Sequence, residues 1–84
     1  MSTEHLVQMA NDIGHFFGAE PKREDAISGI ANHIRRFWDP RMRRQIILHL
    51  AAGGEGLEDL VREAVAMLPA PALSGAPPPS GGVR

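Results

Sequence analysis

The sequence predicts an all-α protein: a small bundle of about four short antiparallel helices, followed by a disordered tail rich in proline and glycine. Apolar residues recur at intervals of three and four along residues 3–68, which is the period of helices with one buried face. The loops between these segments are short and favour antiparallel neighbours. From residue 69 the chain is mostly proline, glycine, alanine and serine, a composition that cannot bury enough apolar area to offset ordering. We therefore assign residues 1–68 to a helical domain and residues 69–84 to a disordered tail.

Length and composition limit what the chain can be. It has 84 residues, a net charge of −1 and no cysteine, which predicts one small domain without disulfides, thiolate metal sites or a cysteine nucleophile. No apolar run approaches the ~20 residues needed to cross a bilayer, and residues 1–5 lack the features of a signal peptide. We expect a cytoplasmic protein without membrane contact. A core of this size rarely supplies more than ~3–5 kcal/mol, so stabilisation by a partner is expected.

Two segments with matching patterns predict the first two helices, at residues 3–17 and from residue 23 or 24 to residue 37. Gly18 is expected to end the first helix. The patterns repeat at an offset of 21 residues, and two copies favour a hairpin of similar helices over a solenoid, which needs at least three. The apolar residues that recur with the helical period are Leu6, Met9, Ala10, Ile13, Phe16 and Phe17 in the first helix, and Ile27, Ile30, Ala31, Ile34, Phe37 and Trp38 in the second.

The third helix is predicted to begin at Asp39-Pro40 and to end at Gly53-Gly54. An Asp at the N-cap accepts hydrogen bonds from first-turn N–H groups, and a proline in the first turn has no N–H to leave unpaired, so both residues have a structural role. The fourth helix is predicted over residues 57–68, with acidic residues at its start, where the helix dipole favours them. The inward positions are Met42, Ile46, Ile47 and Leu50 in the third helix, and Leu57, Leu60, Val61, Ala64, Val65 and Leu68 in the fourth.

Charge is unevenly distributed along the chain. Residues 35–44 hold five arginines and one aspartate, a local charge of +4, whereas residues 55–63 hold four acidic residues and one arginine, a local charge of −3. One interpretation is two solvated helix faces, either apart or facing each other. The other is a basic surface for an acidic partner or a phosphate group, which arginine suits because its planar fork binds such groups bidentately. The adjacent aromatic residues favour the second interpretation.

Two aromatic pairs, Phe16-Phe17 and Phe37-Trp38, stand at the ends of the first two predicted helices. Neighbouring residues on a helix point about 100° apart, so one ring of each pair can face the core while the other turns sideways. We predict that Phe16 and Phe37 face the core. Phe17 and Trp38 are predicted to contact a partner, because four short helices can hardly enclose four rings.

The sequence offers no recognisable catalytic machinery. The four histidines form no pattern typical of a metal site, and the paired acidic residues are ordinary first-turn residues. Gly53-Gly54-Glu55-Gly56 lacks the Lys-Ser/Thr of a phosphate-binding loop. We therefore expect no catalytic residue, cofactor-binding residue or metal ligand in this chain.

One segment carries a specific resemblance. Residues 30–43 read IANHIRRFWDPRMR, and weaker similarity extends to residues 51–57, AAGGEGL, and residues 6–11, LVQMAN. Over roughly residues 5–66 the chain resembles the delta subunit of soluble, NAD-dependent, molybdenum-containing formate dehydrogenases.

The resemblance implies a non-catalytic accessory subunit of a cytoplasmic complex that oxidises formate to carbon dioxide and reduces NAD. In that family the alpha subunit carries a molybdenum bis-guanine-dinucleotide cofactor and iron–sulfur clusters. The beta subunit carries FMN and the NAD site, and the gamma subunit carries a further iron–sulfur cluster. The delta subunit is expected to stabilise the alpha subunit or support its maturation.

We predict that the docking surface surrounds the corner between the second and third helices. Its partner-binding residues are Arg35, Arg36, Phe37, Trp38, Arg41, Met42 and Arg43. One alternative is a small nucleic-acid binder, because an Arg-rich helix after a short turn imitates a helix-turn-helix; the net negative charge argues against it. Another alternative is a free-standing chaperone that binds the molybdenum cofactor through its arginines.

Overall fold

The computed structural model describes residues 2–69 of the chain. Within them lie four helices and no strand: α1 (Thr3–Phe17), α2 (Arg23–Phe37), α3 (Pro40–Ala51) and α4 (Asp59–Ala66). The predicted all-α class is confirmed, and α1 and α2 have the predicted bounds. Helix α4 is shorter than the predicted 57–68. Of the tail predicted at residues 69–84, residues 70–84 lie outside the described part of the chain.

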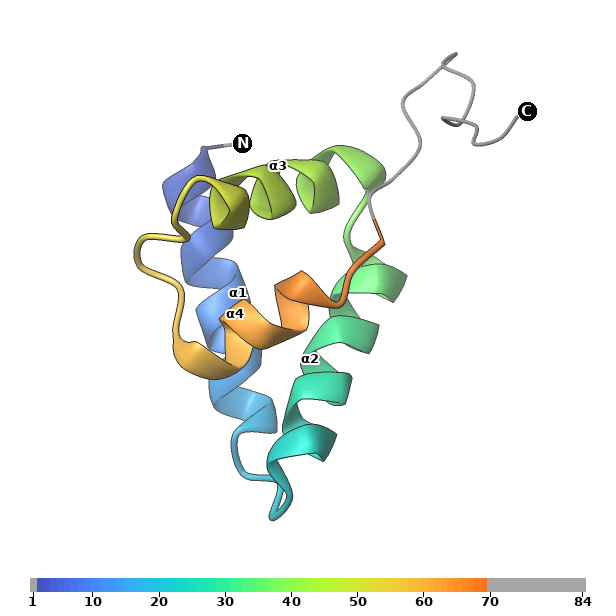
Figure 1. The fold of residues 1–84 in the computed structure, drawn as a ribbon. Coiled ribbons are helices and arrows are strands. Elements are labelled where there is room, and N and C mark those ends of the chain that lie inside the picture. The colour runs from blue at the N-terminus through green and yellow to red at the C-terminus, as the bar shows by residue number, and fades with distance from the viewer. Residues whose placement is uncertain (1, 70–84) are drawn as a thin grey trace, which may run out of the picture.

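Helices α1 and α2 form the hairpin that the matching patterns predicted. Figure 1 shows that they run in opposite directions, that α3 lies across one end of the pair, and that α4 crosses one of its faces. Helix α4 packs on both helices of the hairpin and on α3, and α3 packs on α1. The four helices therefore form a small bundle in which the pair α3–α4 crosses the pair α1–α2.

All four helices contribute to one core. Its largest fully buried side chains are Leu6, Ile30, Ile34, Ile46, Val61 and Val65. Leu57 and Leu68 are also buried in this core, although they lie just outside α4. This explains why apolar periodicity overestimated the length of α4: core residues continue on either side of the helix, while the backbone of Glu58 is already extended.

The α2–α3 corner forms as the sequence predicted. The Asp39 side chain accepts a hydrogen bond of 2.9 Å from the backbone N–H of Met42, and Pro40 is the first residue of α3. The capping carboxylate and the proline thus start a new helix with only two residues, Trp38 and Asp39, between it and the end of α2.

The conformation of the α3–α4 loop depends on glycines and on hydrogen bonds from two side chains outside the loop. Gly53, Gly54 and Gly56 have φ values of 122°, 66° and 89°, a region that other residues rarely adopt. The Arg62 guanidinium donates to the carbonyls of Gly53 and Gly54 at 2.9 and 3.0 Å. Asn11 of α1 donates to the Gly56 carbonyl at 2.8 Å. These bonds fix the loop against the body of the bundle.

Candidate docking surface

Trp38 lies in the core, so its predicted position in an exposed partner contact is wrong. Its side chain is only 4% exposed and belongs to the main hydrophobic cluster. Helix α2 ends at Phe37, and the backbone of Trp38 is already extended, with φ −90° and ψ 138°. Its backbone N–H nevertheless binds the Ile34 carbonyl at 2.9 Å, so Trp38 stands one turn beyond buried Ile34, near the same face of the helix.

Phe16 and Phe37 were predicted to face the core, and both predictions are wrong. Their side chains are 75% and 71% exposed, the largest values among the exposed large hydrophobic residues described. Phe17, predicted to turn toward a partner, is half-buried and packs against the core, with its ring over Gly29 of α2. The two aromatic pairs are thus oriented opposite to the prediction.

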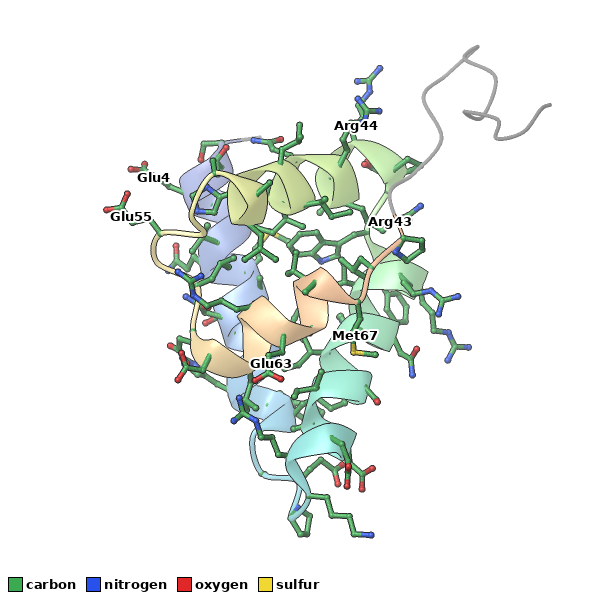
Figure 2. The ribbon with its side chains drawn as sticks, viewed as in Figure 1. Glu4, Arg43, Arg44, Glu55, Glu63 and Met67 are labelled. Carbon is green, nitrogen blue, oxygen red and sulfur yellow. The ribbon has the colours of Figure 1, made fainter. Side chains whose placement is uncertain are left out.

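The arginines of the corner divide into two groups. Arg35, Arg36 and Arg41 are exposed and form no ion pair within residues 2–69. Arg43, predicted to bind a partner, instead donates to the Trp38 carbonyl at 2.7 Å and approaches the Arg35 carbonyl at 3.5 Å. Figure 2 shows Arg43 beside the junction of α2 and α3. This guanidinium satisfies carbonyls at the end of α2, as helix C-termini require.

Met42 and Arg44 complete the corner. Met42, a predicted contact residue, is half-buried and packs against the core, and its backbone N–H binds Asp39. Arg44 is half-buried, and its Nε atom is buried without a hydrogen-bond partner. The exposed part of the predicted surface consequently consists of Arg35, Arg36, Phe37 and Arg41.

An unpredicted feature lies along α1 and α2. Four rings, which we call the aromatic seam, follow one another across the hairpin: Phe16, Phe17, His33 and Phe37. The ring centroids are 5.0 Å apart for Phe16 and Phe17, 6.3 Å for Phe17 and His33, and 4.7 Å for His33 and Phe37. The first two contacts are edge-to-face, an arrangement that aromatic pairs favour.

A depression of about 340 Å³ adjoins the aromatic seam. It is lined by Asp12, Ile13, Phe16, Phe17 and His33. All its walls except the Asp12 carboxylate and the His33 ring are apolar. The sequence feature that could have predicted this site is the match between the first two helices, because Phe16 and Phe37 occupy equivalent positions in the two matching segments.

The basic and acidic segments of the sequence do not pair with each other. Glu58 pairs with His15 of α1 at 2.8 Å, and Glu63 pairs with Arg23 at the start of α2. Figure 2 shows Glu63 on α4, away from Arg43 and Arg44. Glu58 and Glu63 thus join α4 and its preceding loop to α1 and α2. The exposed arginines of the corner have no acidic partner among residues 2–69.

Among residues 2–69, no group of three or more His, Cys, Asp or Glu side chains could hold a metal ion. No helix of this part of the chain is long and apolar enough to cross a membrane. His49, one of the four histidines, contacts the Glu55 carbonyl at 2.8 Å through Nε2.

The chain matches a known protein family over most of its helical bundle. The model of a family described as NADH-dependent formate dehydrogenase delta subunit FdsD matches residues 5–65. The matched region includes α2, α3 and nearly all of α1 and α4. No curated protein and no solved structure matches the chain.

Proposed function

Since the chain belongs to the FdsD family of NADH-dependent formate dehydrogenase delta subunits, we propose that it is a non-catalytic accessory subunit that docks on the catalytic alpha subunit. The family match carries this proposal, because it covers most of the helical bundle and the whole basic corner. Docking would stabilise the alpha subunit or support insertion of its cofactor.

The proposal places the redox chemistry in other subunits of a cytoplasmic complex. The alpha subunit would hold the molybdenum bis-guanine-dinucleotide cofactor and iron–sulfur clusters, the beta subunit FMN and the NAD site, and the gamma subunit a further iron–sulfur cluster. This chain would contribute protein contacts only. A chain of 84 residues builds a small core, so both partners gain from a shared interface.

The surface proposed for this contact is the exposed part of the corner: Arg35, Arg36, Phe37 and Arg41. Three guanidinium groups without an ion-pair partner in the described chain favour an acidic patch, because arginine binds carboxylates through two parallel hydrogen bonds. Trp38 and Arg43 support this surface from inside by fixing the end of α2. Their role is therefore to position the contact.

The experiment is an affinity capture from the native cell extract with the full chain as bait. We expect recovery of a large iron–sulfur flavoprotein that oxidises formate and reduces NAD. An Arg35→Glu/Arg41→Glu variant should recover much less of it, because it places carboxylates against an acidic patch. Lys22→Glu, an exposed charge change in the α1–α2 loop, is the matched control. Recovery of nucleic acid, or of no formate-oxidising protein, would contradict the proposal.

Order-of-addition experiments separate the two roles within the proposal. If the chain supports maturation, cells lacking it should yield alpha subunit with less bound molybdenum, and later addition of the chain should not restore activity. If it stabilises the finished subunit, the molybdenum content should be normal and addition should slow thermal inactivation. Metal analysis and inactivation rates measure these outcomes.

A further inference from the structure

Two of the four exposed large hydrophobic residues in the described part of the chain lie on the α1–α2 hairpin. Phe16 and Phe37 are the two most exposed large hydrophobic residues among those described, and contacts through Phe17 and His33 join them. Exposed and mutually packed rings beside a depression are typical of a surface that a partner covers. The other exposed large hydrophobic residues, Leu48 and Met67, lie on α3 and just after α4.

The charges beside the aromatic seam indicate what kind of partner fits. Arg36 follows His33 by three positions on α2, so the two residues are neighbours on the helix surface. Arg36 is exposed and forms no ion pair within residues 2–69. Asp12 stands at the wall of the depression and is likewise unpaired. A complementary segment therefore places a carboxylate at Arg36 and keeps anionic groups away from Asp12.

We propose that the aromatic seam is the apolar part of the interface with the catalytic subunit. The segment that covers it inserts an apolar side chain into the depression beside Ile13 and sets a carboxylate against Arg36. This inference rests on the proposed function and makes it more specific, because it moves the centre of the interface from the corner onto the α1–α2 hairpin. The seam and the corner are continuous at Arg36 and Phe37.

Single-stranded nucleic acid fits this surface less well. Bases stack on exposed rings, but the binding of such strands also needs a groove of positive charge that follows the phosphates. Here the residues that line the depression include the acidic Asp12 and no arginine or lysine. An apolar segment with one acidic flank satisfies both the rings and the unpaired arginine.

The test measures the dissociation constant between the full chain and purified catalytic subunit prepared from cells that lack this chain. Phe16→Ser and Phe37→Ser remove exposed rings, and Arg36→Glu reverses the charge beside them. Each should weaken binding by roughly 10-fold to 100-fold, the range typical of central interface residues. Leu48→Ser is the matched control, since Leu48 is 61% exposed on α3 and should bind within about 2-fold of the unmodified chain.

The outcomes distinguish this inference from the proposed function. Weakened binding by the three variants with an unchanged control supports the seam as the interface. Tight binding by Phe16→Ser, with loss on Arg36→Glu, Phe37→Ser and Arg35→Glu/Arg41→Glu, overturns the seam but retains the accessory subunit docked through the corner. Failure of the unmodified chain to bind overturns both. Concentration-dependent self-association that Phe16→Ser abolishes, without binding to the catalytic subunit, would assign the seam to a second copy and overturn the inference.

Discussion

The two faces of the α1–α2 hairpin differ in how they are covered. On one face α4 approaches closely, because Gly14 of α1 leaves room for Val61; a Cβ atom at Gly14 would lie 2.6 Å from the Val61 Cγ2 atom. On the other face no described helix covers Phe16 and Phe37. The same two helices thus provide a closed inner face and an open outer face.

Polar contacts reinforce this difference. Asn11 binds the Gly56 carbonyl and the Glu58 N–H, a hydrogen bond joins His15 to Glu58, and an ion pair joins Arg23 to Glu63. These groups hold α4 and its preceding loop on the inner face. On the outer face Asp12 and Arg36 have no ion-pair partner in the described chain. The inner face is therefore held by contacts within the chain, whereas the outer face has exposed rings and charges that are free to meet a partner.

The strongest test of this comparison uses the neighbouring residues Phe37 and Trp38. We expect Trp38→Ala to lower the free energy of unfolding by about 3–5 kcal/mol, because it removes a buried indole from the core. Phe37→Ala removes a ring that is mostly in solvent and should cost less than about 1 kcal/mol. Denaturant unfolding followed by circular dichroism measures both changes.

Fluorescence of the unmodified chain provides an independent check, because Trp38 is its only tryptophan. Its emission should shift to longer wavelength on unfolding, as a buried indole enters water. If the emission of the folded chain already equals that of the unfolded chain, Trp38 is exposed and the assignment of inner and outer rings is reversed.

This pair of residues also shows what the sequence could and could not predict. The helices and the cap at Asp39 were predictable because they depend on neighbouring residues: apolar spacing, a proline and a capping carboxylate. Which ring is buried depends on where α3 and α4 cross the hairpin, and periodicity within α2 contains no information about that. Phe37 and Trp38 follow buried Ile34 by three and four positions, so both lie near its face of α2 and the helical period does not decide between them.

The arginines illustrate the same limit at the candidate site. Five arginines between residues 35 and 44 indicated a basic surface, and Arg35, Arg36 and Arg41 are indeed exposed. Arg43 has the same residue type, but its guanidinium binds the Trp38 carbonyl. Only the geometry of the corner separates a guanidinium that closes a helix end from one that is free to meet a partner.

Substitution of two glycines by alanine tests the two faces a second time, with a smaller expected change in the free energy of unfolding. Gly14→Ala places a methyl group against the buried, stiff side chain of Val61. Overpacking costs typically ~1–3 kcal/mol, and the gain in helix propensity offsets up to ~1 kcal/mol, so we expect a net loss of about 1 kcal/mol. Gly29→Ala meets the Phe17 ring at 2.4 Å, but this half-exposed ring can move outward.

The expected result for Gly29→Ala is therefore no loss of stability, or a gain of up to ~1 kcal/mol from helix propensity. Thermal unfolding of the two variants side by side measures the difference. A larger loss for Gly29→Ala than for Gly14→Ala would show that the outer face is packed as tightly as the inner one.

The smallest expected difference in stability lies between alanine variants of the adjacent residues Asn11 and Asp12. Asn11→Ala removes two hydrogen bonds, of 2.8 Å to the Gly56 carbonyl and 3.1 Å from the Glu58 N–H. At ~0.5–1.5 kcal/mol each, less up to ~0.7 kcal/mol for the better helix propensity of alanine, the net loss is about 1 kcal/mol. Asp12→Ala breaks no ion pair and should stabilise the chain by up to ~0.7 kcal/mol. Denaturant unfolding resolves this difference in sign, and equal losses for both variants would mean that Asn11 does not anchor the loop before α4.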